Sequence, residues 1–188
     1  SLAEQLKVPC FSSSALRFAP GIAAAAKSPT FGGVVGCVAY SPCELEEHHP
    51  DLFWYGIHGV ETLFTVMGPG CKTVVRSMTK DADVVTGTWA DGRIGTFRGI
   101  RDGKKEFGAL VFGKKSVGTT GGFTGYEPLM QEVCKFFKSR VAPTAAAETL
   151  EIYAFMEAAD ESKRTQGAPV SVSETMAKAK AEAAKKLA

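Results

Sequence analysis

Four strand-like segments follow one another through the middle of the chain, and they constrain the fold more than any other feature. Each is short and rich in Val, Ile, Thr and Phe, and they cover residues 73–76, 83–89, 93–98 and 107–112. Asp91-Gly92 and Asp102-Gly103 separate the last three, and such dipeptides form tight hairpin turns. Because consecutive strands joined by short turns pair antiparallel, we predict an antiparallel meander.

Helical and strand patterns surround this meander on both sides. Before it, we predict the end of a helix at residues 2–7, a short strand at 8–11, a helix at 15–26 and a buried strand at 31–40. After it, helices are predicted at residues 127–139 and 145–164, with a weak surface helix at 173–188. The sequence therefore predicts an α+β fold, an open antiparallel or mixed sheet with helices packed on one face.

Composition limits the classes of partner. The chain has 188 residues, of which 45% are hydrophobic and 22% charged, with a net charge of +2. This is the balance of a globular domain, and the charge is too small to predict binding to nucleic acid or to an anionic membrane. No apolar run is long enough to span a bilayer.

The five cysteines predict neither a disulfide framework nor a zinc site. Their number is odd and no two are spaced as a CxxC pair. We expect buried or half-buried thiols in a reducing compartment, and the start of the chain does not resemble a signal peptide. The predicted location is the cytoplasm.

Residues 51–67 carry the strongest candidate for chemistry. On a helix, one face would hold the apolar residues that pack on the sheet: Phe53, Ile57, Val60, Phe64 and Met67. The opposite side would hold the polar and aromatic groups: Asp51, Trp54, Tyr55, His58, Glu61 and Thr62. His58 is the best acid–base candidate because an imidazole exchanges protons near neutral pH. A hydrogen-bonded structural histidine is the alternative.

Metal and nucleotide sites are not predicted from local motifs. His48 and His49 are adjacent, so they cannot easily bind one ion together, and no third ligand stands at a diagnostic spacing. The glycines at 32–33 and 118–125 lack the GxGxxG spacing that binds a pyrophosphate.

Four stretches of the chain, residues 12–18, 49–61, 89–97 and 148–162, together resemble the C-terminal domain of the Gfo/Idh/MocA family of oxidoreductases. The resemblance spans nearly the whole chain. It implies an N-terminal Rossmann domain that binds NAD or NADP, followed by an open-sheet domain that binds the substrate and often forms the oligomer interface. The family's glycine-rich fingerprint and Glu-Lys-Pro motif do not occur in this sequence.

The resemblance also implies a division of the chain. Residues 1–18 would be the end of a Rossmann domain, and residues 19–188 the C-terminal substrate and oligomerisation domain. The parent protein would use NAD or NADP to oxidise a hydroxyl of a sugar, cyclitol or similar polyol, or to reduce the matching ketone. The chain alone is expected to bind no nicotinamide cofactor and to be inactive.

Residue roles follow from the same resemblance. His58 falls on the family's acid–base histidine, and Trp54 stands where many members have its aspartate partner, so Tyr55 or Glu61 would orient the imidazole, or His58 would act without a partner. Trp54, Tyr55, Glu61 and Arg17 are the predicted substrate-binding residues, in a cleft beside residues 12–18. The alternative is a non-catalytic sugar-binding or dimerisation module, and in either case we expect a homo-oligomer through the open face of the sheet.

Overall fold

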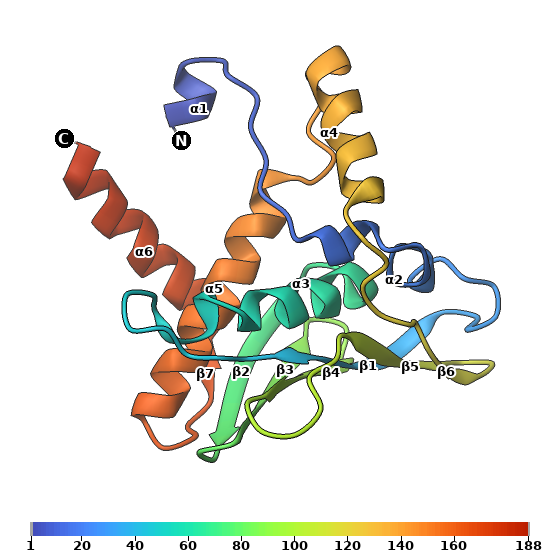
Figure 1. Ribbon diagram of the computed structural model, residues 1–188. Helices are drawn as coiled ribbons and strands as arrows, with labels where there is room; N and C mark the ends of the chain where they lie inside the picture. The colour runs from blue at the N-terminus through green and yellow to red at the C-terminus, as the bar shows by residue number, and fades with distance from the viewer. Residues whose placement is uncertain (1, 188) are drawn as a thin grey trace.

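A mixed sheet forms one layer of the computed structural model, which describes residues 2–187, and the helices lie on one side of it (Figure 1). The strands are β1 (Val34–Pro42), β2 (Cys71–Met78), β3 (Ala82–Trp89), β4 (Ile94–Ile100), β5 (Gly108–Gly113), β6 (Val117–Thr119) and β7 (Val170–Ser171). Over the described residues they form one seven-stranded sheet in the order β6-β5-β1-β4-β3-β2-β7. β1 and β4 pair parallel, and the other neighbours pair antiparallel.

Helices cover one face of this sheet. They are α1 (Leu2–Gln5), η1 (Ala15–Phe18), α2 (Pro20–Ala25), η2 (Asp51–Phe53), α3 (Gly56–Met67), α4 (Glu127–Ser139), α5 (Ala146–Arg164) and α6 (Val172–Leu187), with η marking 3-10 turns. α3 packs on β1 and β4, and α5 packs on β2, whereas α1 and α4 project away from the sheet (Figure 1). The predicted α+β fold, with an open mixed sheet and helices on one face, is confirmed.

Burial along β3 distinguishes the two faces of the sheet. Val85 and Trp89 are buried on the side of the helices, where Phe64, Phe97 and Phe155 are also buried. On the opposite face, Val84 and Thr86 are half-buried and Thr88 is exposed. This period of two is what an antiparallel sheet with one covered face requires.

Gly59 allows α3 to lie directly on the sheet. A Cβ at this position would stand 2.3 Å from the ring of Phe97 and 2.7 Å from Ser41 Oγ, so only glycine fits. The residues that follow on α3 are buried on nearly all sides, and Ile57 is half-buried against the same core. The predicted two-sided helix is therefore buried more completely than its sequence pattern indicates.

The strand order departs from the predicted meander at one place. β2, β3 and β4 are consecutive antiparallel neighbours, as expected. β4 and β5 do not pair, because β1 lies between them. The tight hairpin predicted at Asp102-Gly103 is wrong, since residues 101–107 form a loop that is long enough to cross the end of β1.

Three local predictions also need correction. Residues 8–14 carry no regular secondary structure, so the strand predicted at 8–11 is wrong. The helix predicted at 15–26 is divided into η1 and α2, because Pro20 starts a new helix. The helix predicted from Asp51 begins at Gly56, so Trp54 and Tyr55 precede α3 rather than lying on it.

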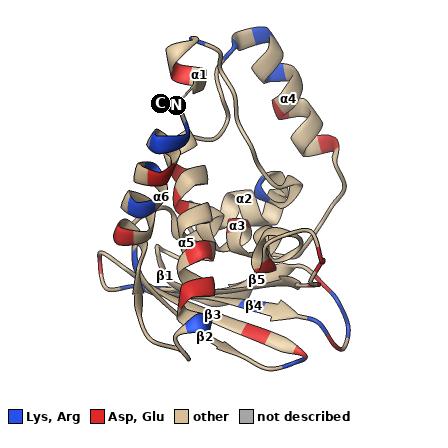
Figure 2. Cartoon of the chain, turned by 90° about the vertical axis from the view of Figure 1, so that its left-hand side faces the viewer, with Lys and Arg blue, Asp and Glu red and all other residues tan. Residues whose placement is uncertain are grey.

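The surface charges, the helix hydrophobicity and the cysteines bear on the predicted class of protein. Figure 2 shows basic and acidic residues alternating along α6, whereas those on α5 are mostly acidic, with Lys163 and Arg164 in its last turn. No helix among residues 2–187 is both long and apolar enough to cross a membrane. All five cysteines are free: Cys37, Cys43 and Cys71 are buried, and burial raises the pKa of each to about 12. Cys10 and Cys134 are exposed, contrary to the prediction.

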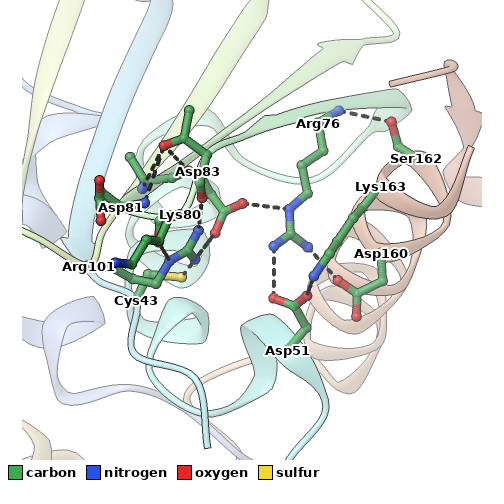
Figure 3. Close-up of polar contacts among 12 residues, drawn as sticks. Cys43, Asp51, Arg76, Lys80, Asp81, Asp83, Arg101, Asp160, Ser162 and Lys163 are labelled. Carbon is green, nitrogen blue, oxygen red and sulfur yellow. Dashed lines mark hydrogen bonds and ion pairs between the residues drawn. The ribbon is translucent and has the colours of Figure 1, made fainter. Parts of the chain in front are cut away.

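A buried arginine joins four elements on the helix side of the sheet (Figure 3). The side chain of Arg76, on β2, is fully buried and donates to three carboxylates. Nε donates to Asp83 on β3 at 2.9 Å, Nη1 to Asp160 on α5 at 2.6 Å, and Nη2 to Asp51 on η2 at 2.8 Å. Because Asp51 begins the turn that leads to Trp54, Arg76 fixes the approach to α3.

Two further cations complete this cluster. Lys163 Nζ donates to Asp51 at 2.6 Å, and Arg101 donates to Asp83. Burial opposes ionisation of Asp51, but the hydrogen bonds from Arg76 and Lys163 outweigh it and lower its pKa. Burial raises the pKa of Asp160 to about 6, and the charge of Asp51 adds to the rise. Asp160 therefore takes up a proton more readily than an exposed aspartate.

We expect Arg76→Met to destabilise the fold by about 3–5 kcal/mol, because it leaves buried carboxylates with an uncompensated charge. Arg164→Met is the matched control, since Arg164 pairs with Glu157 and Glu161 on the surface and is 56% exposed. Its expected cost is about 0–1 kcal/mol. Urea denaturation measures both. Equal, small losses in the two variants would contradict a structural role for Arg76.

Candidate functional site

His58 lies in the first turn of α3, at the point where the helix meets the N-terminal part of the chain. Its side chain is half-buried, and Nδ1 lies 2.9 Å from Ser14 Oγ. Burial lowers the pKa of His58, although the carboxylate of Glu61 acts in the opposite direction. At neutral pH the imidazole is therefore mainly uncharged.

Glu61, one turn further along α3, fastens the N-terminal segment to the helix. Its carboxylate is buried and accepts three hydrogen bonds from that segment. Ser13 Oγ donates to Oε1 at 2.5 Å, Arg17 Nε donates to Oε1 at 2.7 Å, and the backbone N–H of Ser14 donates to Oε2 at 2.7 Å. A carboxylate that receives three donors satisfies its own burial and fixes the path of residues 13–17.

Arg17 extends this contact to a third element. Its Nη1 lies 2.8 Å from a carboxylate oxygen of Glu148, in the first turn of α5. The Arg17 side chain is 12% exposed, and its Nη2 is buried without a hydrogen-bond partner among residues 2–187. Arg17 and Glu61 were both predicted to bind substrate, and here they bind each other.

A row of aromatic rings runs along the outer side of His58. Trp54 packs on His49, with ring centroids 4.5 Å apart, and lies 5.9 Å from Tyr55. Tyr55 is edge-on to His58 at 5.6 Å, and Phe107, from the loop before β5, is edge-on at 6.2 Å. Trp54 is 41% and Tyr55 38% exposed, so both rings present an open surface beside the imidazole.

His58 and Glu61 contact residues 13–17, which include Arg17, whereas Tyr55 contacts the His58 ring and Trp54 contacts Tyr55. Two further members of this group were not predicted. Ser14 contacts His58 across 44 positions of sequence, and Phe107 comes from a loop that the pattern assigned to a strand. Nothing local in the sequence marks either residue as a neighbour of His58.

Two further observations on the described residues concern metal ions and phosphate binding. Among residues 2–187, no three His, Cys, Asp or Glu side chains are arranged to hold a metal ion. The parallel strands β1 and β4 are connected through α3, β2 and β3, which is not the strand–turn–helix unit that binds a pyrophosphate. A groove of about 430 Å³ between α5 and α6 is lined by Phe53, Tyr153, Met176 and several glutamates, but by none of the predicted site residues.

The His58 region has the groups required for proton exchange with a small polar ligand. Nδ1 is occupied by Ser14, and Nε2 has no hydrogen-bond partner among the described residues. A half-buried imidazole with one nitrogen held and the other open is suited to act on the oxygen of a bound hydroxyl or carbonyl. The exposed rings of Trp54 and Tyr55 offer apolar faces next to it.

Known proteins resemble this chain in fold but not in sequence. No family model matches the sequence, and no curated protein matches it in sequence. Solved structures do match in fold. A protein described as a myo-inositol dehydrogenase from Sinorhizobium meliloti superposes with a TM-score of 0.69 at 15% identity, over 83% of this chain and 63% of its own.

Two other structures give the same result. A protein described as an NADPH-dependent oxidoreductase from Desulfitobacterium hafniense has a TM-score of 0.69 at 16% identity, over 92% of this chain and 67% of its own. The myo-inositol dehydrogenase of Lactobacillus casei, solved with NAD(H) and myo-inositol, has a TM-score of 0.65 at 12% identity, over 82% of this chain and 59% of its own.

This chain thus spans about three fifths to two thirds of the length of these proteins. It has the fold of the C-terminal domain of Gfo/Idh/MocA-type dehydrogenases. The resemblance predicted from the sequence is confirmed at the level of fold.

Proposed function

We propose that this chain is the substrate-binding domain of an NAD(P)-dependent dehydrogenase that acts on a hydroxyl of a sugar, cyclitol or similar polyol. The observation that carries the proposal is the open Nε2 of a half-buried His58 next to exposed aromatic rings. The fold likeness to inositol dehydrogenases supports the same substrate class. The free thiols fit the cytoplasm as the compartment.

Each residue then has a role. His58 exchanges a proton or hydrogen bond with the reacting oxygen. Trp54 and Tyr55 pack against the apolar C–H face of the ring. Glu61 and Arg17 support the site indirectly. Their charged groups are already bound to each other, and these contacts hold residues 13–17 in place.

The cofactor belongs to a separate Rossmann domain in this proposal. A nicotinamide, when bound there, supplies or accepts the hydride. We expect the chain alone to bind no NAD or NADP and not to turn over, because its sequence lacks the glycine-rich fingerprint that binds a pyrophosphate. Residues 1–18 would be the end of that Rossmann domain, and residues 19–188 the substrate and oligomerisation domain.

The test is kinetic, in a protein that contains this domain together with its Rossmann domain. We expect His58→Ala to lower turnover by about two to four orders of magnitude, the usual contribution of an acid–base group. Cofactor affinity should not change. His48→Ala is the control, because His48 is exposed and outside the site. Wild-type turnover in His58→Ala would exclude the proposed role.

A specific observation favours a second candidate function, that of a dimerisation module. The open face of the sheet carries a row of exposed apolar side chains, Ile94 on β4, Phe112 on β5 and Val117 on β6, with Gly36 of β1 in register between Ile94 and Phe112. They are 55%, 36% and 59% exposed, respectively. Contiguous apolar surface of this kind is typical of an interface.

We expect the chain to be a dimer or larger in light scattering at micromolar concentration. Phe112→Glu would place a charge in the interface and shift the chain toward the monomer. Val141→Glu serves as a control, since Val141 is 69% exposed and follows α4, away from the sheet. A wild-type monomer would contradict the dimer, and so would an unchanged mass in Phe112→Glu.

A further inference from the structure

We infer that Ser14 is the positioning residue of His58, and that its hydroxyl holds the neutral imidazole with the proton on Nε2. Ser14 Oγ lies 2.9 Å from Nδ1, and the serine is 7% exposed. Trp54, which stands one turn before His58 in sequence, packs on His49 instead. The partner of the imidazole is therefore a hydroxyl, and it comes from the N-terminal segment.

The surroundings of Ser14 Oγ decide the direction of this hydrogen bond. Ser14 caps η1, and its Oγ accepts the backbone N–H of Leu16 at 3.3 Å. Among residues 2–187, the only other hydrogen-bonding neighbour of Oγ is His58 Nδ1. If Nδ1 carried the proton, the buried serine O–H would have no acceptor, which costs free energy. With the serine donating to Nδ1, both Ser14 Oγ and His58 Nδ1 are satisfied.

Within residues 2–187, no charged side chain forms a hydrogen bond or ion pair with the imidazole of His58. Glu61 is the carboxylate whose charge acts on His58, and it accepts hydrogen bonds from Ser13, from Arg17 and from the backbone N–H of Ser14. Glu148, on α5, reaches the region only through Arg17. Tyr55 and Phe107 meet the ring by their edges. Ser14 is thus tied by its backbone to Glu61 and by its side chain to His58.

A hydroxyl partner gives His58 a different resting state from a carboxylate partner. A carboxylate only accepts, so it fixes the proton on Nδ1 and stabilises the charged imidazolium. Ser14 stabilises the neutral ring and leaves Nε2–H as a donor. This step rests on the proposed function. The Nε2–H group would donate a hydrogen bond to the substrate oxygen when that oxygen carries partial negative charge, as a carbonyl oxygen does. Nε2 becomes a proton acceptor only when the serine O–H turns away and accepts from Nδ1.

The experiment is a pH titration of the imidazole nitrogens in the ¹⁵N-histidine-labelled chain by long-range NMR correlation. His48 is exposed and serves as the internal reference. We expect wild-type His58 to carry its proton on Nε2 when neutral. In Ser14→Ala the His58 pKa should rise by about half a unit to one unit, because the serine satisfies its own O–H only beside the neutral ring, so its removal costs the neutral form more than the charged form.

Ser14→Thr keeps the hydroxyl and should retain the wild-type pKa, which separates the hydrogen bond from loss of local structure. A neutral wild-type ring protonated on Nδ1 would overturn the inference. So would a His58 pKa that falls or stays unchanged in Ser14→Ala while Ser14→Thr behaves as wild type. The measurement needs no substrate, cofactor or turnover, so the Ser14 inference can fail or hold separately from the proposed dehydrogenase function.

Discussion

The carboxylate of Glu61 is the constraint on which the candidate site depends. Glu61 lies in the second turn of α3, where its side chain is buried. Three hydrogen-bond donors from residues 13–17 offset the free-energy cost of burying its charge. Those same bonds bring Ser14 to His58 and Arg17 to α5. The site thus exists only where the N-terminal segment meets α3, and neither part forms it alone.

The sheet supplies the rigid base for this contact. Gly59 lets α3 rest on Phe97, and the buried Arg76 cluster holds η2 to β2, β3 and α5. These two features set the height and direction of α3, and therefore the position of His58 and of the rings of Trp54 and Tyr55. The proposed polyol site is in this way built on packed elements, although the residues that line it come from loops and a helix end.

Sequence patterns predicted those helices and strands whose ends are set by nearby residues. The helix at 127–139 agrees with α4 to the residue, because Pro128 near its start and an amphipathic period define it without help from other elements. The strand predicted at 8–11 failed because a strand needs a partner, and no strand among residues 2–187 pairs with this segment. The position of β1 between β4 and β5 is a non-local choice that no turn motif reveals. The site divides in the same way: His58 could be predicted from its segment, whereas Ser14 becomes its partner only through the anchoring by Glu61.

Hydrogen exchange at the backbone amide of Ser14 tests most directly whether Glu61 joins the N-terminal segment and α3 into one site. In the wild-type chain this amide donates to a buried carboxylate, so the account predicts strong protection. Glu61→Gln weakens that acceptor and should lose most of the protection at Ser14, while amides in β3 and β4 keep theirs. A Ser14 amide that exchanges in the wild type as fast as in an unstructured peptide would contradict the account.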